Sequence, residues 1–297
     1  MKYVLMSGGK GKRLWPLSTD EKPKQFIKVF GRACMLENTY NKLVKNFKKK
    51  DVYIATSSEY IDLTKETLPN FKNIIIEKEA IGTVGAILNV AIYIKKVKDA
   101  SDDEIVSILP IDHDIDDSFY TVLTEAEDYI KNSDINLCLI GVKPTRPATQ
   151  YGYIIEENGI INEFKEKPNE ELAKEYIKKG ALWNSGVVVF KLKEILDIAS
   201  NYLSYESYDE FALKYNTLPH ISFDYEVLEK SDNVGIVVYD GHFEDIGTWE
   251  NIANKLSESD EYNTNIINSE EKTIINDGVK NIIVINTKDG IRIIPKN

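Results

Sequence analysis

Cysteines and long apolar runs are scarce in this chain of 297 residues, and their scarcity excludes two classes of protein. The two cysteines, Cys34 and Cys138, lie far apart, and Cys138 is inside the apolar run LCLIGV. This is typical of buried reduced thiols and not of a disulfide framework. No run of about eighteen apolar residues is present, and the first residues lack the apolar core of a secretory signal. We therefore expect a cytoplasmic protein with no membrane partner.

Acidic side chains outnumber basic ones in the chain as a whole, but the basic ones are concentrated near its start. There are 37 lysines and arginines against 48 aspartates and glutamates, which gives a net charge of −11. This balance argues against a nucleic-acid partner, because a protein that coats nucleic acid needs a basic face. Residues 1–30 nevertheless carry seven basic and two acidic side chains. That asymmetry indicates a small anionic ligand bound by this segment.

A glycine-rich segment lies in the basic region, directly after a strand-like run. Residues 7–18 read SGGKGKRLWPLS. Glycines can adopt positive φ and bring backbone N–H groups close to an anion, while the three basic side chains can donate to phosphate oxygens. The dinucleotide-binding pattern fails because Leu14 stands where its third glycine belongs, and the P-loop pattern fails at its first glycine and its Ser/Thr. We interpret the segment as a cradle for nucleotide phosphates, and an ordinary strand-to-helix turn is the alternative.

Short apolar runs alternate with helical patterns over the first half of the chain. Strands are predicted at 3–6, 52–55, 74–77, 105–109, 137–142, 152–156, 160–164, 187–190 and 235–239. Helices are predicted at 35–47, 59–68, 82–98, 118–131 and 169–179. The alternation favours an α/β fold with a mixed, mostly parallel central sheet flanked by helices. Ligands of such sheets bind at the carboxyl ends of the strands, where the glycine-rich segment falls.

The second half of the chain has fewer crossovers and ends in a short β-rich tail. Asn158-Gly159 separates two strand-like runs and is typical of a tight hairpin turn. After residue 256 the sequence turns polar and then returns to β-like runs at 282–285 and 291–294. We expect one domain over residues 1–256 and a C-terminal segment over 257–297, which is too short for an independent core.

Two aspartates follow predicted strands at the expected ligand edge. Asp112 comes just after the run EIVSILPI, and Asp245 comes shortly after the last strand predicted before the tail. Mg²⁺ is usually bound by one or two carboxylates together with phosphate oxygens and water. The acidic residues at 114, 116 and 117 fit the cap and first turn of a helix instead. Asp112 is the better candidate for a metal ligand because it directly follows its strand, and Asp245 is a second acidic site that could share the metal, at a spacing that the sequence leaves open.

Eight motifs follow one another along residues 1–253. They are SGGKGKRLWPLS, KPKQF, LPIDH, PTRPATQYGYI, FKEKP, LWNSGVVVF, FDYEVLEK and FEDIGTW. This is the order found in sugar-phosphate nucleotidyltransferases, and the chain resembles that family over these residues. Trp15, LWNSG and FDYEVLEK are similar to the mannose-1-phosphate guanylyltransferase branch in particular. The tail resembles the β segment of short members, so no isomerase domain like that of bifunctional members is expected.

The resemblance implies a Rossmann-like, GT-A-like domain and a definite reaction. The oxygen of a sugar 1-phosphate attacks the α-phosphorus of a nucleoside triphosphate, and pyrophosphate leaves. A phosphomonoester with a second pKa of about 6 is mostly dianionic at neutral pH, so no catalytic serine, cysteine or histidine is required. The protein has to position two anions and neutralise the transferring group. GTP and mannose 1-phosphate are the substrates that the resemblance favours.

The resemblance also implies a role for each site residue. The expected catalytic residues are Arg13, Lys24, Asp112, Lys167 and Asp245. The expected nucleotide-binding residues are Ser7, Gly8, Gly9, Gly11, Arg13, Gly82, Thr83, Gly85 and Asp112. The expected sugar-phosphate-binding residues are Gly152, Glu166, Lys167 and Asn184, and Mg²⁺ is the expected cofactor at Asp112 and Asp245.

Three departures from the family's usual pattern leave alternatives open. Lys12 replaces a small hydroxyl residue, Gln150 replaces a glycine, and residues 81–87 read IGTVGAI in place of an Arg-Asn-Thr-Ala-Pro pattern. The last change leaves the base undetermined. The alternatives are the same chemistry with another nucleoside triphosphate or another hexose or heptose 1-phosphate, and an inactive regulatory paralogue that binds a sugar nucleotide. The apolar tail is compatible with a homodimer.

Overall fold

The chain folds into two compact units, here taken from a computed structural model. The structure describes residues 1–9, 11–28, 33–231, 233–249, 251–252, 264–268 and 279–295. Unit 1 comprises residues 1–8, 40–110 and 116–242, and unit 2 comprises residues 9–39, 111–115 and 243–297. The predicted domain boundary between residues 256 and 257 lies outside the described residues and stays a prediction.

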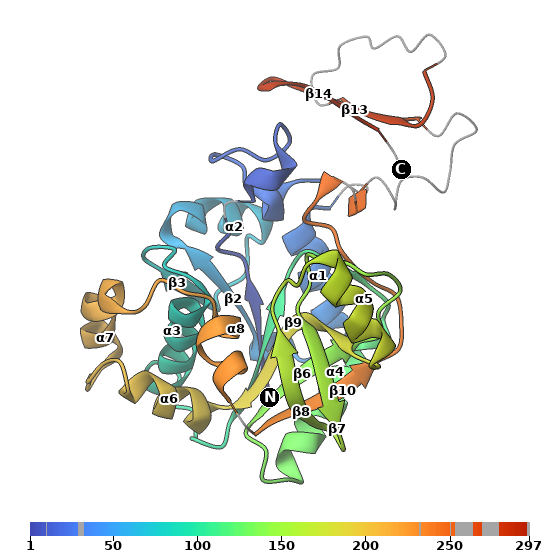
Figure 1. Ribbon diagram of the computed structural model, residues 1–297. Helices are drawn as coiled ribbons and strands as arrows, with labels where there is room; N and C mark the ends of the chain where they lie inside the picture. Colours follow the sequence, from blue (N-terminus) through green and yellow to red (C-terminus); the bar gives the residue numbers. More distant parts are fainter. Residues whose placement is uncertain are drawn as a thin grey trace. The chain divides into compact units, whose positions relative to one another are not determined.

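Unit 1 is built on a nine-stranded mixed sheet (Figure 1). Its strands are β1 Lys2–Met6, β2 Val52–Ser57, β3 Ile74–Glu77, β4 Ile105–Pro110, β6 Leu137–Val142, β7 Tyr153–Glu157, β8 Ile160–Lys165, β9 Leu182–Lys191 and β10 Val234–Tyr239. They are arranged in the order β3-β2-β1-β4-β9-β6-β10-β8-β7. The first four are parallel, as βαβ units require, and β9 is antiparallel to both β4 and β6. The predicted mixed α/β sheet is confirmed.

Helices lie on both faces of this sheet. The α-helices whose bounds fall within the described residues are α1 Met35–Asn46, α2 Ile61–Thr67, α3 Thr83–Lys96, α4 Phe119–Lys131, α5 Glu170–Lys178, α6 Leu192–Ser200, α7 Tyr208–Lys214 and α8 Phe223–Glu226. Helix α3 packs with α6, α7 and α8, and this layer shares a core with Leu137 and Leu139 of β6. Side chains alternate along a strand, so Cys138 points to the opposite face, where α4 contacts β6. None of the helices among the described residues combines the length and apolar character needed to cross a membrane.

The β7–β8 hairpin closes part of the sheet on itself. Its turn has Asn158 at φ 55° and Gly159 at φ 80°, which confirms the hairpin predicted from this dipeptide. Strand β8 pairs with β10, and β7 pairs with the start of β9 through Tyr153 and Trp183. The main-chain N–H of Asn184 also donates to the Gly152 carbonyl at 2.8 Å. The closure therefore brings the YGYI and WNSG motifs into contact.

Among its described residues, unit 2 has two small sheets and residues 9–18 of the glycine-rich segment. Its strands are β5 His113–Ile115, β11 Phe243–Asp245, β12 Thr264–Asn268, β13 Ile282–Thr287 and β14 Gly290–Pro295. Strands β13 and β14 form an antiparallel hairpin over the two β-like runs predicted for the tail. The β5–β11 pair was not predicted, and Asp114, expected at a helix terminus, lies in β5.

Candidate active site

The two aspartates predicted to bind metal lie together in unit 2. Strands β5 and β11 pair with Asp245 opposite His113, and the Ile246 N–H donates to the Asp112 carbonyl at 2.8 Å. The Gly247 N–H donates to Asp245 Oδ1 at 2.7 Å. An ideal Cβ at Gly247 would lie 2.8 Å from Asp245 Oδ1 and 3.1 Å from Asp112 Oδ2. The two carboxylates therefore converge on one point, and only glycine leaves room for them.

Charges of both signs meet at this point. The Lys24 ammonium forms an ion pair with Asp112. Burial alone would raise the pKa of Asp112. The attraction of the carboxylate to Lys24 and His113 is the larger effect, so this pKa is lowered. Burial and the nearby charge of Asp112 raise the pKa of Asp245. The carboxylate oxygens suit Mg²⁺, and the ammonium suits a phosphate.

A metal ion at this site would need ligands from a substrate. Among the described residues, no group of three or more acidic, histidine or cysteine side chains is placed to hold a metal ion. Two carboxylates alone leave most of the octahedral positions of Mg²⁺ to water and phosphate oxygens, which is the usual arrangement when this ion binds with a nucleotide. The residues present therefore fit a magnesium ion shared with a nucleotide.

The glycine-rich segment of unit 2 combines buried anchors with an exposed face. Gly11 has φ +59°, and an ideal Cβ there would lie 2.6 Å from Lys24 Cβ, so glycine is needed for conformation and for space. Ser18 Oγ donates to the Gly11 carbonyl at 2.7 Å, and Leu14 is fully buried. Gly9 and Arg13 are exposed, and among the described residues no atom beyond the chain neighbours of Gly9 lies within 4 Å of an ideal Cβ there. The exposed face can therefore receive an anion.

In unit 1, a buried carboxylate lies beside the start of this segment. Glu77, which ends β3, is 7 % exposed, and its Oε1 accepts a hydrogen bond from the Tyr215 hydroxyl at 2.6 Å. An ideal Cβ at Gly8 would lie 3.1 Å from Glu77 Oε2, and the buried Ser7 donates its N–H to the Ala55 carbonyl at 2.7 Å. Burial raises the pKa of Glu77, although Tyr215 opposes the shift. Sequence reasoning missed Glu77 because, unlike Asp112, it belongs to none of the quoted motifs, and its partner Tyr215 lies 138 residues along the chain.

The residues predicted to approach the base are packed against protein. Gly82 has φ +109°, and an ideal Cβ there would lie 2.5 Å from the Ile221 carbonyl oxygen. Thr83 Oγ1 accepts the N–H of Phe223 at 2.7 Å. An ideal Cβ at Gly85 would lie 3.0 Å from the Tyr215 hydroxyl oxygen. These residues hold the segment that carries Tyr215 against the start of α3, and their contact with a base stays a prediction.

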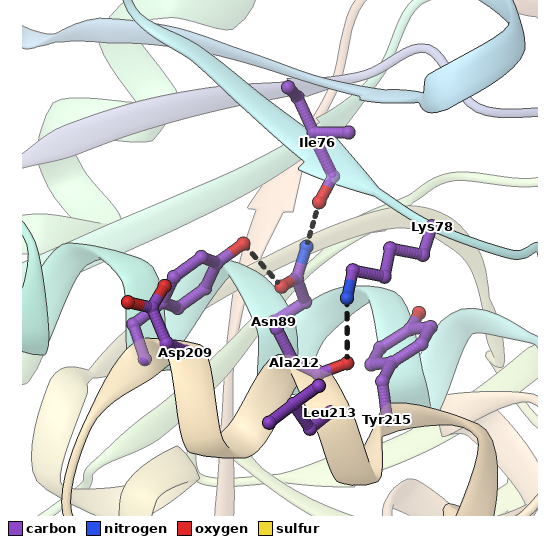
Figure 2. A pocket seen from close by; sticks show the side chains of 8 residues that line it. Ile76, Lys78, Asn89, Asp209, Ala212, Leu213 and Tyr215 are labelled. Carbon is purple, nitrogen blue, oxygen red and sulfur yellow. Dashed lines mark hydrogen bonds between the residues drawn. The ribbon is translucent and has the colours of Figure 1, made fainter.

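The Tyr215 ring also lines a cavity of about 410 Å³, which Figure 2 shows from close by. The lining residues are Ile76, Lys78, Asn89, Tyr208, Asp209, Ala212, Leu213 and Tyr215. Asn89 donates to the Ile76 carbonyl at 3.1 Å and accepts from Tyr208 at 3.0 Å, and Lys78 donates to the Ala212 carbonyl at 3.3 Å. Asn89, Tyr208 and Lys78 are thus bonded to one another or to main-chain carbonyls of the lining, so we assign the cavity a supporting role for Tyr215.

The four residues predicted to bind the sugar phosphate lie together in unit 1. An ideal Cβ at Gly152 would lie 2.7 Å from Glu166 Oε2, so glycine allows this carboxylate to approach the main chain. The Lys167 ammonium pairs with the other oxygen of Glu166. Asn184 Nδ2 donates to Asp224 Oδ1 at 3.0 Å. The cluster therefore also includes Asp224, which the sequence analysis did not single out within FDYEVLEK.

This cluster offers hydrogen-bond acceptors in a buried setting. Burial raises the pKa of Glu166; Lys167 opposes this shift and Asp224 adds to it. Burial also raises the pKa of Asp224. Asn184 Oδ1 accepts the Gly186 N–H at 3.0 Å, which fixes the orientation of the amide. Two carboxylates and a fixed amide suit the hydroxyls of a sugar, and the exposed Lys167 suits its phosphate.

Comparisons with known proteins agree with this chemistry. The model of the nucleotidyl transferase family matches residues 2–261. The mannose-1-phosphate guanylyltransferase RfbM of Salmonella typhimurium strain LT2 is 31 % identical over 99 % of this chain and 69 % of its own length. The mannose-1-phosphate guanylyltransferase of Klebsiella pneumoniae is 29 % identical over 97 % of this chain and 69 % of its own. The crystal structure of mannose-1-phosphate geranyltransferase from Thermus thermophilus superposes with a TM-score of 0.81 at 26 % identity, covering 99 % of this chain and 94 % of that one.

Proposed function

The chain belongs to the nucleotidyl transferase family, and we propose that it transfers the guanylyl group of GTP to mannose 1-phosphate, forming GDP-mannose and pyrophosphate. The proposal rests on one observation: Asp112, Asp245 and Lys24 converge in unit 2, as magnesium-assisted transfer to a phosphate requires. Relatives that align over nearly the whole chain carry the name of this activity.

The reaction needs positioning and charge neutralisation more than proton transfer. An oxygen of mannose 1-phosphate forms a bond to the α-phosphorus of GTP, and the bond from this phosphorus to the β-phosphate oxygen breaks. The nucleophile is already a dianion at neutral pH, and pyrophosphate leaves as an anion. The protein must therefore hold two mutually repelling anions in line. Cations and backbone N–H groups can do this without a catalytic base.

We assign the triphosphate of GTP to residues of unit 2. The exposed Gly9 and the Arg13 guanidinium can donate to its phosphate oxygens, and Asp112 and Asp245 would hold Mg²⁺. When bound, this ion neutralises negative charge on the phosphates. The Lys24 ammonium, now paired with Asp112, can donate to the transferring phosphate instead.

We assign mannose 1-phosphate to the cluster in unit 1. Glu166 and Asp224 can accept hydrogen bonds from sugar hydroxyls, and the oriented Asn184 amide adds a donor. The exposed Lys167 can pair with the phosphate once it leaves Glu166. Each group of the sugar phosphate then meets a partner of matching chemistry.

We attribute the preference for guanine over adenine to Glu77. Guanine presents two donors side by side, N1–H and the N2 amine, and a carboxylate can accept from both. Adenine presents a ring acceptor at N1, which an ionised carboxylate repels. Glu77 lies among the residues expected to approach the base, because its partner Tyr215 contacts Gly85. This supports GTP over ATP.

A matrix of substrates tests the proposal. Purified protein with Mg²⁺ is incubated with each of five nucleoside triphosphates and several hexose 1-phosphates, and pyrophosphate release is measured. We expect the highest rate with GTP and mannose 1-phosphate. If no pair releases pyrophosphate, the proposed enzymatic activity is wrong. If another pair gives the highest rate, only the choice of substrates is wrong.

A pair of charge-removing variants locates the metal site. Asp112→Asn should lower turnover at saturating substrates by about 100-fold or more, because the metal loses one of two carboxylates. Asp117→Asn removes an exposed carboxylate that pairs with Lys45 and should leave turnover unchanged. Near-normal activity of Asp112→Asn would remove this residue from the site.

The remaining assignments concern the setting of the enzyme. We propose Mg²⁺ as the physiological metal, the cytoplasm as the location and a homodimer as the assembly. Metal dependence of the rate and the mass of the protein in solution test the first and the last of these.

A further inference from the structure

The β13–β14 hairpin contacts the glycine-rich segment within unit 2, although the two are far apart in sequence. Arg292 Nη1 donates to the Trp15 carbonyl at 3.1 Å across 277 residues. Thr287 Oγ1 donates to the Pro16 carbonyl at 3.2 Å across 271 residues. Two successive carbonyls of the segment are therefore held by side chains of one hairpin.

The turn of the hairpin is shaped to receive the Trp15 ring. Gly290 has φ +150°, and an ideal Cβ there would lie 3.2 Å and 3.3 Å from two carbons of this ring. The Trp15 carbonyl also accepts a hydrogen bond from Trp249 Nε1 at 3.1 Å. Both acceptor positions of this carbonyl are thus used, one of them by Arg292. Its orientation is fixed from two sides.

The held residues are the outer part of a tight turn in the phosphate cradle. The N–H groups of Leu17 and Ser18 donate to the Leu14 carbonyl at 2.9 Å and 3.1 Å, which closes the turn around Trp15. Ser18 Oγ then donates to the Gly11 carbonyl at 2.7 Å. A displacement of Trp15 would therefore reach Gly11, which packs against Lys24.

We propose that Thr287, Gly290 and Arg292 are positioning residues that hold the glycine-rich segment in the conformation that binds the triphosphate. A glycine-rich segment has much conformational freedom, and ordering it on binding costs affinity. A hairpin that orders it beforehand reduces that cost. That the bound anion is a nucleoside triphosphate rests on the proposed function. That the hairpin orders the segment does not.

The first test measures order in the ligand-free, full-length protein. Arg292→Ala should speed amide hydrogen exchange in peptides covering residues 9–18 by about fivefold or more, because local opening becomes easier. Arg292→Lys keeps the positive charge and should recover part of the protection. Ile293→Ala is the matched control, since Ile293 lies on the same strand and is 63 % exposed. Unchanged exchange in Arg292→Ala would overturn the inference whether or not the protein is an enzyme.

The second test separates positioning from general stability. Arg292→Ala should raise the KM for GTP about tenfold, which corresponds to about 1.4 kcal/mol, and leave the KM for mannose 1-phosphate within about twofold. Gly290→Ala should act in the same direction because its side chain would press on Trp15. A parallel rise of both KM values, or a fall of kcat alone, would contradict a specific effect on the triphosphate.

Discussion

Replacing Glu77 by glutamine tests whether a buried carboxylate reads the guanine base. Glu77 accepts one hydrogen bond from Tyr215 at 2.6 Å and another from the backbone of Ile81. Two carboxylate oxygens offer about four acceptor positions, so two remain for the N1–H and N2 amine of guanine. Glutamine keeps the shape of the side chain but turns one acceptor into a donor. We therefore expect Glu77→Gln to lose much of the preference for GTP.

The size of the effect follows from the burial of the side chain. A well-formed two-point contact to a base edge is worth about 1–3 kcal/mol of discrimination, or about 5- to 150-fold. Glu77 is only 7 % exposed, so water can replace little of what is lost. We expect the ratio of kcat/KM for GTP to that for ATP to fall by at least about tenfold. ITP lacks the N2 amine, so the ratio of kcat/KM for GTP to that for ITP should also fall in Glu77→Gln.

The pH dependence gives an independent reading of the same carboxylate. Burial raises the pKa of Glu77, so its ionised form is lost at a higher pH than for an ordinary glutamate. The preference for GTP should be complete above that pKa and should decline as the pH falls through it. Glu77→Gln has no group to titrate at this position, so its ratio of kcat/KM for GTP to that for ATP should not change with pH.

The assay compares kcat/KM for GTP, ITP and ATP in the wild type and two variants over a range of pH. Asp209→Asn is the control, because Asp209 is an exposed acid lining the cavity beside Tyr215. It should leave all three values unchanged. If Glu77→Gln keeps the ratio of GTP to ATP, Glu77 does not read the base.

Three further changes test the metal site, the sugar cluster and the packing of Gly82. Asp245→Asn should lower kcat by about 100-fold or more in a pyrophosphate-release assay, since it removes a proposed metal ligand; full activity would exclude that role. Burial raises the pKa of Glu166, so the ionised side chain destabilises the fold as the pH rises through this pKa. Glu166→Gln should therefore raise the KM for mannose 1-phosphate yet raise the thermal unfolding temperature at neutral pH, a gain that disappears in acid. Gly82→Ala should lower the free energy of unfolding in urea by about 2 kcal/mol or more, because φ is +109° and the new Cβ would lie 2.5 Å from the Ile221 oxygen; a smaller loss than about 0.5 kcal/mol would contradict this.

Elements that carry a repeated local pattern could be predicted from the sequence. Predicted strands 74–77 and 137–142 match β3 and β6, and predicted helix 82–98 contains α3. The β5–β11 pair could not be predicted, because three residues are too few to show alternation and their partner is far along the chain. The seven-residue α7 is similarly short for a periodic signal. Pairing of such short elements is decided by tertiary contacts.

The candidate site was predictable where motifs or strand ends marked it. Asp112 and Asp245 were singled out because both follow predicted strands, and the structure brings their carboxylates to one point. Glu77 and Asp224 were missed because the hydrogen bond that singles each of them out, to Tyr215 or to Asn184, joins residues far apart in the sequence. Glycines were the hardest residues to interpret. Gly9 has open space around it, as expected for a residue that faces a ligand, whereas Gly82 is closed off by a carbonyl, and the sequence alone cannot separate these two uses.

The chain has a negative net charge although both proposed substrates are anions. The surroundings of the acidic side chains in the site reconcile the two. Asp112 and Asp245 face a place where a divalent cation can bind, so their charge helps to bring that cation to the phosphates. In the proposed function, Glu77, Glu166 and Asp224 instead meet neutral parts of the substrates that offer donors, namely the base edge and the sugar hydroxyls. Burial raises the pKa of all three, so holding them ionised costs stability in the free protein. Substrate donors would offset that cost, so binding GTP and mannose 1-phosphate should stabilise the wild-type fold more than it stabilises a variant with neutral side chains at these positions.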